Sequence, residues 1–211
     1  MTISDLRPRG CALAFTLFLS ITVNDAVQAQ PAATGPPDWP CVQRLIPELA
    51  WGTLWAGPSP DELEQAWWDD EEIGSVVRFA TSRDTTVEDA VARVRSFVET
   101  ASPGEQRLTL LFSGLFEQIN DERSSTITGI RSASRAQVAR LERISQIVDE
   151  LEIQRASDNA RETAITRLEK ELHWELRTFE MRQKILPALC EQPYLLEERL
   201  ARMIRVIDAE L

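Results

Sequence analysis

Apolar residues recur at intervals of three and four through the second half of the chain, and this helical period constrains the fold more than any other feature. One series alternates steps of four and three, as the seam of a coiled coil does: Gln137, Leu141, Ile144, Val148 and Leu151. A second series has a similar spacing: Ile165, Leu168, Leu172, Leu176 and Phe179. No segment shows sustained alternation with β-branched residues, so no strand is predicted. The predicted fold class is therefore all-α.

The two series predict a helical bundle built around a long antiparallel, coiled-coil-like hairpin over about residues 103–186. Residues 120–137, which are rich in Ser, Thr and Arg, fit either a loop or a continuous helix kinked near Gly129. We favour the helix. The helical domain as a whole is expected to cover residues 61–211.

Two prolines interrupt the helical pattern near the C-terminus. Pro187 and Pro193 predict a break that contains Cys190, because proline removes a helical hydrogen bond. A last amphipathic helix is expected over residues 194–207.

Three helix starts carry capping signals. Ser59 before Pro60 and two acidic residues predicts a helix that runs to about Ala80. The runs over residues 85–88 and 102–105 have the spacing of capping boxes, with Thr85 and Ser102 as the expected N-caps.

Residues 1–29 have the three parts of a secretory signal peptide. Arg7 and Arg9 precede an apolar run over residues 11–23, which is shorter than the roughly 20 residues of a membrane-spanning helix. Small residues at the end of the segment predict cleavage after Ala29, and an uncleaved N-terminal anchor is the alternative. We therefore expect a periplasmic or secreted protein with no membrane span after cleavage.

Residues 30–60 form a Pro/Trp-rich segment whose prolines and glycines predict an extended chain. Cleavage would leave two of the three cysteines, Cys41 and Cys190. Since disulfides persist in exported proteins, we predict a Cys41–Cys190 bond that ties this segment to the C-terminal helices. A redox-active or metal-binding pair is the alternative, although the Cys-x-x-Cys motif of such proteins is absent.

Five of the six tryptophans lie within 30 residues: Trp39, Trp51, Trp55, Trp67 and Trp68. One interpretation is that they seal the helical bundle from outside. The other is that they form a docking surface for a partner, because tryptophan is enriched at interface hot spots.

The net charge of −11, from 34 acidic and 23 basic residues, argues against wholesale binding to nucleic acid or anionic lipid. A single histidine and three cysteines exclude metal sites that need several imidazole or thiolate ligands. The sequence therefore predicts no metal, no other cofactor and no nucleic-acid partner.

Two clusters of titratable residues have side chains that could carry out chemistry. His173 with Glu169 and Glu175 could share a proton or a metal ion, but a flank position on a helix is the simpler interpretation. The acidic run over residues 69–72 is expected to be a solvated helix face, because consecutive residues point around a helix and do not converge on a calcium ion. No nucleophile, phosphate-binding or haem motif is present, so no catalytic residue is predicted.

Three functions remain as hypotheses. The first is an exported, non-enzymatic helical protein that binds another exported protein or itself as an interaction or accessory scaffold subunit. The second is a small-molecule sensor or carrier with an apolar pocket near Phe112, Phe116, Phe179 and Trp174. The third is an enzyme that uses His173 with nearby glutamates.

Overall fold

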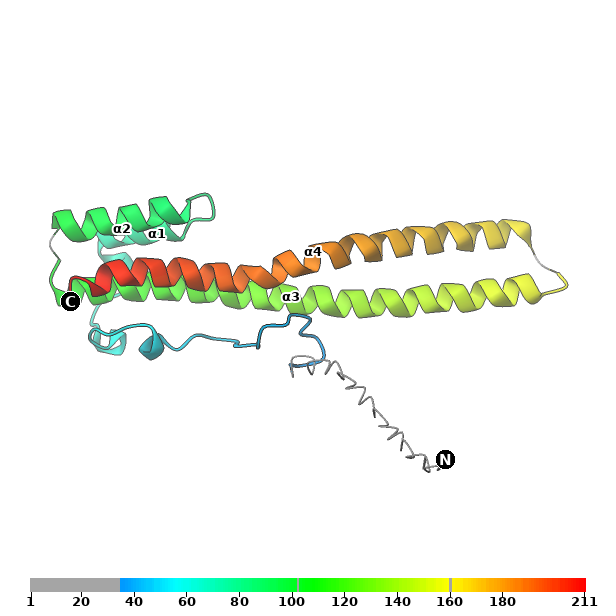
Figure 1. Ribbon diagram of the computed structural model, residues 1–211, viewed down its shortest axis with the longest axis horizontal. Helices are drawn as coiled ribbons and strands as arrows, with labels where there is room; N and C mark the ends of the chain where they lie inside the picture. The colour runs from blue at the N-terminus through cyan, green and yellow to red at the C-terminus, as the bar shows by residue number, and fades with distance from the viewer. Residues whose placement is uncertain (1–34, 102, 160) are drawn as a thin grey trace, which may run out of the picture. The chain divides into compact units, whose positions relative to one another are not determined.

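The computed structural model describes residues 35–101, 103–159 and 161–211, all within one compact unit, Ala32–Leu211. Its main elements are four α-helices: α1 (Glu71–Thr81), α2 (Val87–Ala101), α3 (Glu105–Ala156) and α4 (Glu162–Asp208). Three short 3-10 helices precede them: η1 (Trp51–Thr53), η2 (Pro60–Glu62) and η3 (Trp67–Asp69). The described ranges contain no β-strand, and α3 and α4 pack along each other as an antiparallel pair (Figure 1). The all-α prediction and the long hairpin are confirmed, whereas the predicted signal peptide, residues 1–29, lies outside the described residues.

α3 runs without interruption through residues 120–137, as the helical interpretation predicted. Its threonines bond back to the carbonyl four residues earlier: Thr126 Oγ1 donates to Glu122 O at 2.8 Å, and Thr128 Oγ1 donates to Ser124 O at 3.0 Å. Hydroxyl groups that bond in this way do not compete for the helical N–H groups. The 52 residues of α3 span about 78 Å at a rise of 1.5 Å per residue.

The predicted break at Pro187 and Pro193 is wrong. Both prolines lie inside α4, and so does Cys190, so there is no separate last helix over residues 194–207. A proline in a helix interior costs about 3 kcal/mol. Packing against the rest of the bundle offsets this cost, since Pro193 is buried and so are four apolar residues further along α4: Leu200, Met203, Ile204 and Ile207. The hairpin therefore extends to Asp208, beyond the expected boundary at residue 186.

The predicted helix from Ser59 to about Ala80 is replaced by two 3-10 turns and a later α-helix. Ser59 Oγ accepts from Asp61 N at 3.2 Å, but the helix that it caps ends at Glu62. α1 begins only after Asp70, whose Oδ1 accepts from Ile73 N at 3.0 Å. Trp67, in the second of the two turns, is buried in the main apolar core.

Trp67 is buried against α3 at a glycine. A Cβ on Gly114 would lie 2.8 Å from Trp67 Cγ and 2.8 Å from Val77 Cγ2, closer than real Cβ atoms approach. The absence of a side chain at Gly114 therefore allows η3 and α1 to approach α3.

The two capping boxes are displaced by one or two residues. α2 is capped by Thr86, whose Oγ1 accepts from Asp89 N at 3.1 Å, and not by Thr85. α3 begins at Glu105 with Gly104 as its N-cap, so Pro103 precedes the helix. Ser102, the expected cap, lies outside the described residues.

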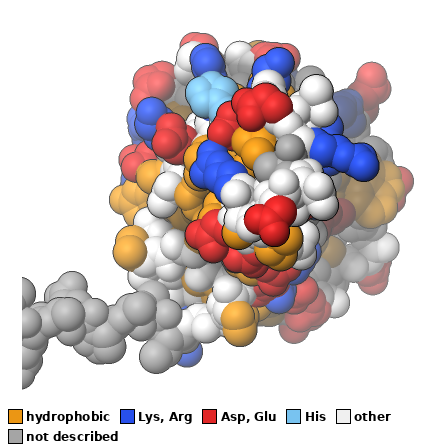
Figure 2. All heavy atoms as spheres, turned by 90° about the vertical axis from the view of Figure 1, so that its right-hand side faces the viewer, with side chains coloured by type: hydrophobic (Ala, Val, Ile, Leu, Met, Phe, Trp, Pro, Cys, Tyr) orange, Lys and Arg blue, Asp and Glu red, His pale blue; other side chains and the backbone are white. Residues whose placement is uncertain are grey.

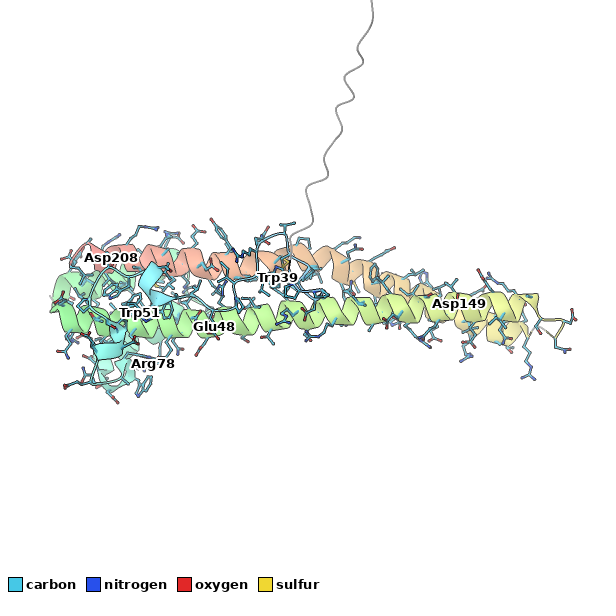
Figure 3. The ribbon with its side chains drawn as sticks, turned by 90° about the horizontal axis from the view of Figure 1, so that it is seen from below. Trp39, Glu48, Trp51, Arg78, Asp149 and Asp208 are labelled. Carbon is cyan, nitrogen blue, oxygen red and sulfur yellow. A yellow bond between two sulfur atoms is a disulfide. The ribbon has the colours of Figure 1, made fainter. Side chains whose placement is uncertain are left out.

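The base of the hairpin, defined as α3 residues 105–135 with α4 residues 186–208, is covered on two sides. α1 and α2 lie along one side, and an N-terminal arm, residues 35–70, lies along the other (Figures 1 and 3). The main apolar cluster is at this base and includes the fully buried Phe112, Leu115, Leu200 and Met203. The distal half of the hairpin, residues 136–185, receives no such cover from the described chain (Figure 1).

Candidate functional site: the N-terminal arm and the distal hairpin

The N-terminal arm is fastened near the middle of the hairpin by a disulfide and by ion pairs. Cys41 and Cys190 are bonded, with their Cα atoms 5.6 Å apart, as the cysteine count predicted. Close by in sequence, Asp38 Oδ2 accepts from Arg131 Nε at 3.0 Å and also pairs with Arg135. The hydrogen bond from Arg131, together with the charge of Arg135, holds the pKa of Asp38 below its usual value.

From this point the arm descends along α3 in the opposite chain direction. Leu49 N donates to Asn120 Oδ1 at 3.0 Å, and further down Trp55 stacks on Phe112 with ring centroids 4.3 Å apart. As residue numbers rise along the arm, the α3 residues that it contacts have falling numbers. The arm is thus an ordered covering layer, although it has no helical period of its own.

The tryptophans of the arm serve mainly to cover the core. Trp55 and Trp67 are each only 7% exposed, and Trp51 packs against the same cluster. Trp39 is partly buried and donates from Nε1 to Gln43 O at 2.7 Å.

The docking hypothesis therefore cannot apply to Trp55 and Trp67 without rearrangement. Trp68, which is 56% exposed and meets Trp67 edge to face, remains the one of the five with a mostly free ring.

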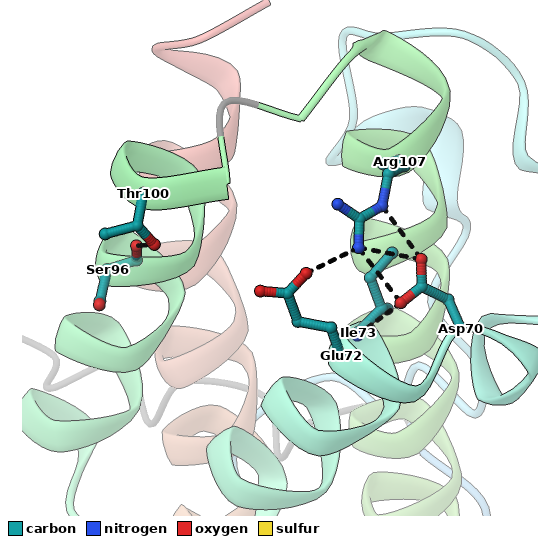
Figure 4. Close-up of polar contacts among 6 residues, drawn as sticks. All are labelled: Asp70, Glu72, Ile73, Ser96, Thr100 and Arg107. Carbon is teal, nitrogen blue, oxygen red and sulfur yellow. Dashed lines mark hydrogen bonds and ion pairs between the residues drawn. The ribbon is translucent and has the colours of Figure 1, made fainter.

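The acidic run over residues 69–72 is not a uniformly solvated face. Asp70 caps α1, and its Oδ2 lies 3.0 Å from Arg107 Nη2, which also reaches Glu72 (Figure 4). Partial burial favours the neutral form of Asp70, but the hydrogen bonds from Ile73 N and Arg107 outweigh it and lower its pKa. These contacts join α1 to the start of α3, which is a structural role.

The apolar seam of the distal half is narrower than predicted. Ile147, Leu151 and Leu168 form a buried cluster. Three predicted seam residues are exposed instead: Leu141 at 49%, Leu176 at 41% and Val148 at 36%. A stripe that repeats every seven residues drifts around a straight α-helix by about 20° per heptad. Spacing alone therefore could not decide which of two neighbouring stripes on α3 faces α4, and in the structure Ile147 occupies the position that faces it.

A polar layer separates this distal cluster from the core of the base. Gln137 Nε2 donates to Phe179 O at 3.2 Å, and Arg140 pairs with Glu175. In the described part of the chain, Gln137 Oε1 and Arg140 Nε are buried without a hydrogen-bond partner. The helices are therefore held together here by polar contacts rather than by apolar packing.

Large apolar side chains are exposed on both helices of the distal half. On α4 these side chains include Trp174, Met181, Ile185 and Leu195, and Thr178, Ala188 and Gln192 lie between them, so that the seven residues follow alternating steps of four and three. We call these seven residues the α4 stripe, which runs from the distal half into the base. Trp174 is 65% exposed, and Met181 and Ile185 are each 55% exposed. On α3, Val138, Leu141 and Val148 form a second exposed set. Seen from the tip of the hairpin, hydrophobic side chains interrupt a surface of mixed charge (Figure 2).

His173 is exposed on α4, and its two neighbouring glutamates are already engaged. Glu169 Oε1 lies 2.6 Å from Arg155 Nη2, and Glu175 pairs with Arg140. Among the described residues, no group of three or more His, Cys, Asp or Glu side chains is placed to hold a metal ion. The ion pairs link α3 to α4, so the glutamates serve the hairpin in this arrangement.

The four aromatic residues expected around a ligand pocket do not come together at one place. Phe112 is fully buried and stacks on Phe116 with centroids 5.8 Å apart, inside the core of the base. Phe179 lies opposite Gln137, about 37 Å along α3 from Phe112 by helix rise, and Trp174 is exposed further on. These four residues therefore do not lie around a single cavity in the described part of the chain.

Comparison with known proteins adds no relative. No family model, curated protein or solved structure matches the chain. Within the described ranges, no helix has both the length and the apolar character needed to cross a membrane.

Proposed function

We propose that this chain is an exported, non-enzymatic accessory or scaffold protein that binds another protein through the distal half of its hairpin. Export is supported by the signal-peptide pattern and by the disulfide, a bond typical of oxidising compartments. The placement of the exposed apolar side chains is the observation that carries the proposal. At the base the same helices are covered by the N-terminal arm, α1 and α2.

A partner that covered the distal half would gain apolar burial. Trp174, Met181 and Ile185 are each more than half exposed, and Leu141 is nearly so. Completing the burial of such side chains contributes about 1 kcal/mol each, from a full value of about 1.5–3 kcal/mol. Clustered exposed apolar residues of this kind mark interaction surfaces.

The chain allows a selective crosslinking test. Its only lysines, Lys170 and Lys184, both lie in the distal half of α4. Apart from the N-terminal amine, an amine-reactive crosslinker can therefore react only on this half of the hairpin. It is added to the full-length expressed protein in an extract of the native exported fraction, and crosslinks through Lys170 or Lys184 are scored by mass spectrometry. We expect a discrete crosslinked complex with one protein, identified by mass spectrometry.

Matched variants decide whether the distal half is responsible. Met181→Asp should abolish the complex, whereas Phe79→Asp, which changes a 45% exposed residue on α1, should leave it intact. Circular dichroism would confirm that both variants keep their helical content. The proposal is overturned if wild type forms no complex or if both variants behave alike.

A further inference from the structure

α4 carries two apolar stripes, and only one of them faces α3. The inner stripe includes the buried Leu168 and Leu200, and the outer one is the α4 stripe, which extends over three heptads. A helix with a neighbour on one side needs a single apolar stripe. The second stripe therefore indicates a second neighbour that the described chain does not provide.

Towards its C-terminal end the α4 stripe continues into positions that are already packed. Arg199 Nη2 donates to Ala80 O at 2.7 Å, at the end of α1. Arg202 Nη1 lies 2.9 Å from Glu88 Oε1 on α2. This cover ends at the loop between α1 and α2, and Leu195 beyond it is 46% exposed. The exposed part of the stripe thus continues an existing helix–helix interface.

The charges along one edge of the α4 stripe change sign at its middle. Arg177 and Lys184 come before the middle, and Glu191 and Glu198 come after it. All four are exposed, and none belongs to an ion pair within the described ranges. In an antiparallel coiled coil with a second copy, Lys184 would lie beside Glu191 and Arg177 beside Glu198. A parallel copy would instead bring Arg177 beside Arg182, so the charge order selects the antiparallel pairing.

We propose that two copies of the chain pair antiparallel through the α4 stripe, about a two-fold axis near Pro187. In this register Ile185 packs on Ala188 of the second copy, and Trp174 reaches Leu195 and Arg199 of the second copy. The inference rests on the proposed function, because it names a second copy as the protein that covers the stripe.

A groove lies where Trp174 of the second copy arrives. It has a volume of about 640 Å³ and is lined by Leu195, Leu196 and Arg199 of α4 and by Gly129 of α3. A Cβ added at Gly129 would meet nothing within 4 Å, so this wall of the groove is open. An indole ring beside an arginine is an anchor of the kind that dominates binding energy. The two-fold axis would supply two such anchors.

Charge reversal tests this arrangement by sedimentation equilibrium of the full-length expressed protein. Lys184→Glu alone places like charges beside Glu191 twice per dimer, and Glu191→Lys alone does the same beside Lys184. Each single variant should raise the dissociation constant at least about tenfold, the effect of a few weak pairs turned repulsive. An equimolar mixture of the two variants should restore association, because every pair is again of opposite charge.

A matched control and a second variant keep the test independent of folding. Asp149→Lys reverses a charge on α3 away from the stripe (Figure 3) and should leave the dissociation constant unchanged, whereas Trp174→Ala should weaken the dimer with no loss of helical signal. A wild-type protein that stays monomeric at about 100 μM, or a variant mixture that does not reassociate, overturns the pairing. If the extract complex described above persists in that case and contains a different protein, the proposed function stands without it.

Discussion

Replacing Cys41 and Cys190 with serine is expected to release the N-terminal arm before the hairpin unfolds. The bond joins residues 149 apart, and the chain-entropy model assigns a loop of that length about 5 kcal/mol of stability. That figure is an upper bound, because the arm is also held by the ion pairs of Asp38 and by Trp55 in the core. We expect a loss of about 2–4 kcal/mol in the free energy of unfolding, the range typical of native disulfides.

Two measurements separate a loss in the arm from a loss in the hairpin. Urea unfolding followed by circular dichroism gives the free energy of unfolding and the slope that reports exposed surface. Hydrogen exchange read by mass spectrometry should show faster exchange over residues 35–50 and unchanged exchange around Ile119 and Ile127, which are buried in α3. Wild-type protein reduced with a thiol reagent should match the double serine variant.

Two results would refute this reasoning. A loss below about 1 kcal/mol, well under the range of native disulfides, would show that the noncovalent contacts of the arm suffice to hold it. Equal deprotection of the arm and of α3 would show that the bond supports the whole hairpin and not the arm in particular.

Three further predictions follow from the base of the hairpin. Gly114→Ala should destabilise the fold by about 1–3 kcal/mol in urea unfolding, the usual cost of overpacking, because its Cβ would overlap Trp67. Asp70→Ala should lower the free energy of unfolding by about 1–2 kcal/mol at neutral pH, because the helix cap and the pair with Arg107 are both lost. The pKa of Asp70 is lowered in the folded protein. The stability difference between wild type and variant should therefore be present above the unfolded pKa near 4 and disappear as the pH falls through the folded pKa. The pH dependence at Asp208 should have the opposite sign, because burial raises its pKa. Its charge therefore destabilises the fold as the pH rises through the range between its unfolded and folded pKa, so Asp208→Asn should raise the free energy of unfolding at pH 7 but not at pH 3. An equal effect at pH 7 and at pH 3 would contradict that cause.

The helical class and the cysteine pair were readable from the sequence because both rest on simple local or countable features. Apolar residues that recur at intervals of three and four over a long stretch indicate an α-helix. Of the three cysteines, the two that follow the predicted signal peptide can form only one intramolecular bond. By contrast, nothing local marks Leu141 as exposed and Ile147 as buried, since both fit a helical stripe. Their difference depends on the angle at which α4 lies against α3.

The prolines of α4 also show where prediction from local sequence fails. Pro187 and Pro193 predict a break when the helix is considered alone, because each removes a backbone hydrogen bond. In the folded chain the helix continues through both, with Pro193 buried against its neighbours. The energy that decides this outcome comes from residues distant in sequence, so no local pattern reports it.

The sequence by itself determined that the chain is helical, that its longest helices pair, and which cysteines bond. Only the tertiary structure decided that the N-terminal arm covers one side of the base, that Trp55 and Trp67 are core residues, and that the α4 stripe is left without a neighbour. The physical reason is that periodicity records how many faces of a helix are apolar, whereas the identity of the neighbour on each face depends on how the elements pack together.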